Sequence, residues 1–158
     1  MRAWLTLLLA SSLTTSALAN DSAKVVGTWK LVSFVNEFQD GSEPRGAYGN
    51  RPTGYIIFTP DGRMMSVVEA EGRKPPENDE QRAAAFRTII AYTGMYRLEG
   101  DKWITAVDVA WNPAWIGTDQ VRFYKLEGDR LVVNSAWAPS TNFPGKTVRV
   151  YVTWTRVK

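Results

Sequence analysis

Two short motifs at opposite ends of the sequence limit most strongly what this chain can fold into. Gly27-Thr28-Trp29 opens the first strand-like segment, and Trp154-Thr155-Arg156 closes the last one. An arginine guanidinium can lie over the face of an indole ring, so Arg156 and Trp29 can plug one end of a barrel whose first and last strands meet. Gly27 carries no side chain, which lets the chain pass close beneath that plug. The motifs therefore predict a closed barrel with one sealed end.

Alternation of apolar and polar residues dominates the rest of the chain and indicates strands. We expect eight of them, at about 28–36, 54–59, 63–69, 93–99, 102–110, 118–126, 131–138 and 147–157. The predicted fold class is all-β: an eight-stranded antiparallel up-and-down barrel with one inserted helix.

The inserted helix is expected over about 79–91. Asn78 or Asp79 can cap its N-terminus, and no helix breaker follows within that range. Phe86 with Ile89 or Ile90 would then face the barrel, so the helix would cross the barrel mouth or cover its wall.

The connections between strands are of two kinds. Three are tight turns, at 59–62, 99–101 and 127–129, and four are long, at 37–53, 70–92, 111–117 and 139–146. In an up-and-down barrel the tight turns fall at the end that carries Trp29 and Arg156, which we call the floor. The long loops fall at the opposite end, the rim. Eight strands enclose just enough space for side chains or for one small ligand.

The N-terminal stretch has the pattern of a cleaved signal peptide. Arg2 is followed by an apolar run that includes Leu5 to Leu9, and Ala17-Leu18-Ala19 is an A-x-A cleavage site. We expect residues 1–19 to be removed and residues 20–158, beginning at Asn20, to form one barrel domain in the periplasm or outside the cell. The apolar run is too short for a membrane span.

Composition excludes several chemistries. The chain has no Cys and no His, which rules out disulfides, thiolate or histidine catalysis and the usual zinc and haem ligands. We assign no catalytic residue, metal or cofactor, and any catalysis would depend on carboxylates, Tyr, Lys or Arg. Lysine and arginine are scattered at a net charge of +3, so no nucleic-acid surface is expected. Seven tryptophans suit an apolar pocket or a barrel core.

The sequence repeats one hairpin, Leu-Glu-Gly-Asp, at 98–101 and 126–129, and this repeat sets which side chains point inward. Strand alternation then carries the inward face from Leu126 to Tyr124, Arg122 and Gln120. A charge at Arg122 inside an apolar barrel is costly unless a hydrogen-bond partner or an opposite charge compensates it. The candidates are Tyr96, Tyr124, Gln120, an internal carboxylate or a ligand. The alternatives are satisfaction by the protein's own hydrogen bonds, or a bulge that turns Arg122 outward.

The same alternation predicts a cavity in which Arg122 is the only fixed charge. Its expected lining is Leu31, Tyr96, Val107, Gln120, Arg122, Tyr124, Val133, Ser135 and Val150. The rim aromatics are Tyr48, Trp111, Trp115, Trp137 and Phe143, which either surround the mouth or form a second small core. The candidate ligand-binding residues are Arg122, Gln120, Tyr124, Tyr96, Ser135, Trp111, Trp115 and Trp137. Asp108 is expected to face outward, which argues against a catalytic role.

Five stretches together resemble the bacterial and fungal lipocalin-like domain family, a branch of the small calycin-type barrels. They are Val26–Phe34, Gly54–Met64, Tyr92–Tyr96, Asn112–Arg122 and Trp154–Arg156. The resemblance implies an antiparallel barrel with an internal cavity for a small, mostly apolar molecule, and no single activity. Arg122 matches the Gln-x-Arg of the family. Members often carry His in the strand before the Asn-Pro loop, and this chain has none there.

Three functions are compatible with these observations. The first is a periplasmic or secreted protein that binds a small amphipathic or hydrophobic ligand. Arg122 would then bind a carboxylate or another anionic group of that ligand. The second is an envelope interaction module whose barrel is filled by its own side chains. The third is a small isomerase, cyclase or hydratase that uses a pocket Tyr or Arg. A ligand-sized void distinguishes the module from the other two.

Overall fold

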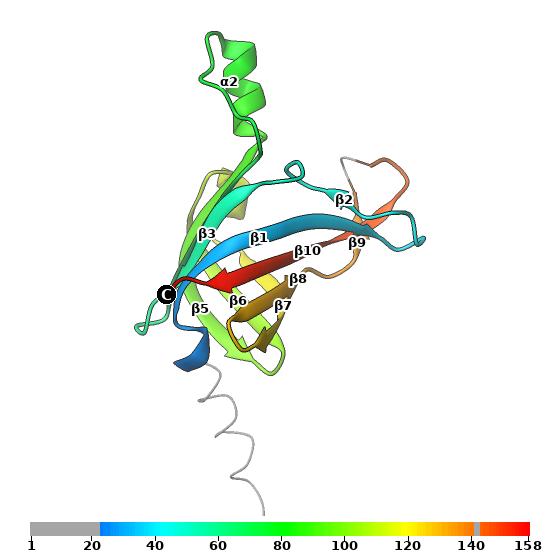
Figure 1. The fold of residues 1–158 in the computed structure, drawn as a ribbon. Helices are drawn as coiled ribbons and strands as arrows, with labels where there is room; N and C mark the ends of the chain where they lie inside the picture. The colour runs from blue at the N-terminus through cyan, green and yellow to red at the C-terminus, as the bar shows by residue number, and fades with distance from the viewer. Residues whose placement is uncertain (1–22, 141–142) are drawn as a thin grey trace, which may run out of the picture.

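A computed structural model describes residues 23–140 and 143–158 and shows a closed antiparallel barrel (Figure 1). Its elements are β1 (Gly27–Phe38), β2 (Arg45–Gly46), β3 (Thr53–Phe58), β4 (Arg63–Glu69), α2 (Asp79–Phe86), β5 (Ile89–Glu99), β6 (Lys102–Ala110), the 3-10 helix η1 (Pro113–Trp115), β7 (Asp119–Glu127), β8 (Arg130–Asn134), β9 (Ala138–Pro139) and β10 (Thr147–Arg156). The main strands follow the order β1-β3-β4-β5-β6-β7-β8-β10, and β10 pairs with β1 to close the barrel. The prediction of an eight-stranded up-and-down barrel is confirmed. The predicted signal peptide and its cleavage site lie outside the described residues.

The floor forms as the end motifs predict. Trp29 on β1 is paired with Arg156 on β10, and the Arg156 guanidinium carbon lies 4.1 Å from the centre of the Trp29 ring. Trp29 is fully buried and donates its indole N–H to the Val25 carbonyl at 2.9 Å. Arg156 donates from Nη1 to the Val26 carbonyl at 2.9 Å. The guanidinium thus ties the last strand to the segment that leads into the first.

The hairpin faces are also as predicted. Leu98 pairs with Trp103 across the β5–β6 turn, and Leu126 pairs with Leu131 across the β7–β8 turn. All four side chains belong to the core or pack against it. The repeated Leu-Glu-Gly-Asp hairpin therefore sets the inward face correctly.

The predicted helix is shorter and lies elsewhere than expected. Asn78 caps α2 by accepting the Gln81 backbone N–H at 2.9 Å, but the helix ends at Phe86 rather than at residue 91. Ile89 and Ile90 instead begin β5 and extend its pairing with the end of β4. β-branched residues favour a pleated strand, and an available neighbouring strand decides between the two conformations.

As a result, α2 stands at the tip of an arm, formed by the β4–β5 connection at residues 70–88, that projects away from the barrel (Figure 1). None of its residues is buried, and Phe86 is 50% exposed. The prediction that this helix crosses the rim or covers the wall is wrong. Among the described residues, no helix is long and apolar enough to cross a membrane.

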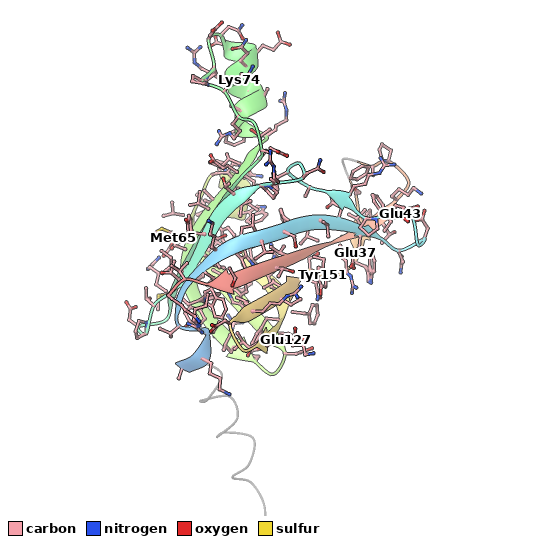
Figure 2. The ribbon with its side chains drawn as sticks, in the orientation of Figure 1. Glu37, Glu43, Met65, Lys74, Glu127 and Tyr151 are labelled. Atoms are coloured by element: carbon pink, nitrogen blue, oxygen red, sulfur yellow. The ribbon has the colours of Figure 1, made fainter. Side chains whose placement is uncertain are left out.

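Side chains that point away from the barrel interior lie on the outer wall, the arm and the turns. Figure 2 shows Met65 on the outside of the sheet, Lys74 on the arm and Glu127 by the β7–β8 turn. Asp108 faces outward, as predicted, and pairs with Arg63 at 2.8 Å between Oδ2 and Nη2. This ion pair gives Asp108 a structural partner on the surface, away from the barrel interior.

Candidate functional site

The barrel encloses a cavity of about 340 Å³ above the floor. Its walls are mostly aromatic and aliphatic, with a few polar groups and two arginines. The lining residues are Phe34, Asn36, Ala47, Tyr48, Ile56, Ser66, Val68, Arg87, Ile90, Tyr92, Trp103, Trp115, Arg122, Val133, Ser135, Val150, Val152 and Trp154. This volume and this mixture of an apolar wall with few polar groups are typical of a small-molecule site.

A β-bulge decides which residues of β1 reach the cavity. Pairing with β10 shifts between Leu31 and Ser33, so inward alternation changes from odd to even positions. Phe34 and Asn36 line the cavity as a result, whereas Leu31 is buried in the core and is not part of the lining. Alternation carried along β1 without the bulge would miss both lining residues.

Arg122 lies on β7, paired with Trp103 of β6, and its side chain lines the cavity. Its Nη1 donates to the Val121 carbonyl at 2.8 Å, and its Nη2 donates to Gln120 Oε1 at 3.3 Å. The guanidinium carbon is 5.9 Å from the centre of the Trp115 ring. None of the ion pairs among the described residues includes Arg122. The protein's own hydrogen bonds therefore position this charge without neutralising it.

Arg87 is a second cation at the cavity and corrects the prediction that Arg122 is the only one. Arg87 is the C-cap of α2, and it is exposed to solvent although it lines the cavity. Residue 87 was expected to lie within the helix at 79–91, so the sequence around Arg87 did not predict that it lines the cavity. The cavity therefore combines a half-buried arginine with an exposed one.

Two pairs of aromatic rings border the cavity. Phe34 stacks on Tyr48, with 5.1 Å between ring centres and 9° between planes. Tyr92 meets Trp115 edge to face at 5.3 Å and 74°. All four residues line the cavity.

Burial changes the acidity of the two cavity tyrosines. It raises the pKa of the Tyr92 hydroxyl above its usual value near 10, and the nearby Arg122 charge acts in the opposite direction. Burial also raises the pKa of the Tyr48 hydroxyl. Both groups are therefore neutral hydrogen-bonding phenols at physiological pH.

The predicted ligand-binding residues divide into two groups. Arg122, Trp115 and Ser135 line the cavity. Ser135 also holds the chain in place, because its Oγ donates to the Ala136 carbonyl and accepts the Val150 backbone N–H.

The other five do not line it. Gln120 supports the Arg122 guanidinium, and Trp111 packs edge to face on Trp115 at 4.8 Å. Trp137 lies under the Arg149 guanidinium at 4.7 Å. The remaining two belong to the core or pack against it, namely Tyr96 and Tyr124. Binding by any of the eight stays a prediction.

A closed antiparallel barrel with a plugged end and an internal cavity defines the class of small barrel proteins to which this chain belongs. The family model of the lipocalin-like domain matches residues 26–157, so the chain is a member of the lipocalin-like domain family. This confirms the family predicted from the sequence. No curated protein matches the chain.

Proposed function

We propose that this protein is a periplasmic or secreted binding protein that holds a small, mostly apolar anion in its barrel cavity. The observation that carries the proposal is Arg122, a cation on an apolar cavity wall that has no carboxylate partner among the described residues. A carboxylate on the ligand can accept two parallel N–H bonds from such a guanidinium. The surrounding apolar surface stabilises the rest of the ligand by removing it from water.

The cavity favours this function over a filled interaction module. Its volume of about 340 Å³ is far larger than the space that one water molecule needs. A module that only presents its outer surface gains nothing from an unfilled interior, since empty space forfeits packing contacts.

The neutral tyrosines favour binding over proton abstraction. A general base needs a pKa near the working pH, whereas burial moves the pKa of Tyr92 upward, away from it. Tyr92 is therefore suited to donate a hydrogen bond to a ligand and unsuited to remove a proton from one.

Calorimetric titration of the purified protein with octanoate and 2-naphthoate, and with the matching neutral amides, tests the proposal. We expect saturable binding of at least one acid, tighter than binding of its amide. Arg122→Met keeps much of the side-chain volume and should weaken acid binding by about 1.5–3 kcal/mol, with little effect on the amide.

Arg130→Met is the matched control, because Arg130 is an exposed arginine at the start of β8 outside the cavity lining. It removes the same charge and should leave acid binding unchanged. Absence of saturable acid binding, or equal acid binding by Arg122→Met and the wild type, would refute the anion site. Sequencing the N-terminus of exported protein tests the location and should begin at Asn20.

A further inference from the structure

We infer that the ligand of this cavity is a planar aromatic carboxylate whose ring lies between two aromatic pairs. This inference rests on the proposed function and specifies its ligand class. The two pairs are Phe34 with Tyr48 and Tyr92 with Trp115, and we call the space between them the aromatic slot.

The two pairs lie on opposite sides of the barrel. Phe34 belongs to β1, whereas Tyr92 belongs to β5 and Trp115 to the β6–β7 connection. In the strand order, β3 and β4 separate β1 from β5 on one side, and β6, β7, β8 and β10 separate them on the other. A molecule in the cavity is therefore bordered by rings from both directions.

The Tyr92 and Trp115 side of the slot is held in place by its own loop. Asn112 accepts the Ala114 backbone N–H at 3.1 Å, and Thr118 donates its hydroxyl to the Trp115 carbonyl at 2.8 Å. Trp111 also packs edge to face against Trp115, at 4.8 Å between ring centres. A wall that is already ordered loses little conformational entropy when a ring packs on it.

Arg122 and Trp115 are spaced for an acid attached directly to a ring. The guanidinium carbon is 5.9 Å from the Trp115 ring centre, so a ligand whose carboxylate binds Arg122 can place a directly attached ring against Trp115. Aromatic rings favour offset or edge-to-face contacts with other rings beyond what burial of their area gives. The moderate cavity volume also suits a compact ligand rather than a long acyl chain.

Two probes with the same skeleton test the inference by calorimetry. 2-Naphthoate is planar and aromatic, and decahydro-2-naphthoate is its saturated, puckered analogue with the same carboxylate. We expect the wild type to bind 2-naphthoate at least tenfold more tightly. Trp115→Leu should reduce this preference to threefold or less, chiefly by weakening 2-naphthoate.

Phe123→Leu is the control, because Phe123 is an aromatic residue of β7 outside the cavity lining and is not one of the candidate ligand-binding residues. It should leave the preference unchanged. Tyr48→Leu alters the opposite side of the slot and should also lower the preference, which keeps the test valid if Trp115→Leu does not fold.

The possible failures are distinguishable. Equal binding of the two acids by the wild type would overturn the aromatic slot while the anion site stands. Equal weakening of both acids by Trp115→Leu would also overturn it, because Trp115 would then act only as apolar surface. Saturable binding of neither acid, and of no acid in the series above, would refute the proposed function together with this inference.

Discussion

The guanidinium of Arg156 lies over the indole of Trp29 at 4.1 Å and seals the floor of the barrel. It also donates to the Val26 carbonyl, while the Trp29 ring beneath it is fully buried. Stacking and hydrogen bonding from one side chain thus join β10 to β1 at the point where the barrel closes.

Arg156→Ala should lower the free energy of unfolding by about 1–3 kcal/mol, because it removes the stacking on Trp29 and leaves a backbone carbonyl without its donor. Urea unfolding followed by circular dichroism measures the change. Arg130→Ala, which changes an exposed arginine on the neighbouring strand β8, should change the free energy by less than about 0.5 kcal/mol. An equally small effect of Arg156→Ala would show that the plug is not needed for stability.

Gly27→Ala should destabilise the barrel by about 2 kcal/mol. Gly27 has φ +133°, and a Cβ there would lie 2.7 Å from Arg156 Nη1. Both the backbone conformation and the contact disfavour a side chain. Gly72→Ala is the control for a positive φ without a steric contact, because its φ is +73° and nothing lies within 4 Å of the added Cβ. It should destabilise the barrel less than Gly27→Ala does.

The two floor variants should not be additive. In Gly27→Ala/Arg156→Ala the added methyl no longer meets the guanidinium, so the double variant should be more stable than the sum of the single effects predicts. Strict additivity would show that backbone strain alone, without the contact to Arg156, causes the destabilisation by Gly27→Ala.

Stability should fall above about pH 10 because of the cavity tyrosines. An unfolded tyrosine loses its proton near pH 10, whereas folded Tyr92 still holds its proton there. The folded state then binds more protons, so the free energy of unfolding decreases as the pH rises. The stabilisation that protonated Tyr92 contributes is fully present below pH 10 and is lost as the pH rises further. Tyr92→Phe should therefore make the alkaline decrease in stability shallower, as measured by urea unfolding at pH 8–11.

Arg122→Met should raise the pKa of Tyr92 further, because the positive charge that favours its phenolate is removed. NMR of protein labelled with carbon-13 at the tyrosine ζ position measures this titration, and Tyr92→Phe assigns the signal. An unchanged titration in Arg122→Met would show that the two groups do not interact.

The arm that carries α2 should be dispensable for the barrel. Its helix has no buried residue, so replacing residues 74–86 with a short Gly-Ser turn should leave the barrel's unfolding midpoint within error. Hydrogen exchange at α2 should be faster than in β1 or β10, since exposed backbone hydrogen bonds open readily. Exchange as slow as that of the strands would indicate a packing role that the structure does not show.

The sequence predicted much of the fold because its signals are local. Period-two alternation, the three tight turns and the repeated hairpin each depend on residues close together in the chain. The plug was predictable because the chain ends of a closed up-and-down barrel meet. The length of α2 was not, because Ile89 and Ile90 are compatible with a helix and become strand only by pairing with β4.

The candidate site was only partly predictable. Alternation from the Leu126 hairpin brought Arg122 to the cavity, but the same rule also included Gln120 and Tyr124, which do not line it. Alternation gives the side of the sheet on which a side chain lies. It does not say whether that position lies in the packed core or in the open part of the barrel.

The sequence by itself determined the barrel, its plugged end and the inward face of the hairpin strands, because these follow from local periodicity and from the two end motifs. Only the tertiary structure decided the composition of the cavity. The bulge in β1 directs Phe34 and Asn36 inward, and the register between strands brings Trp115 to Arg122 and Tyr92. These contacts join residues of different elements, and their geometry depends on how all eight strands pack around one interior.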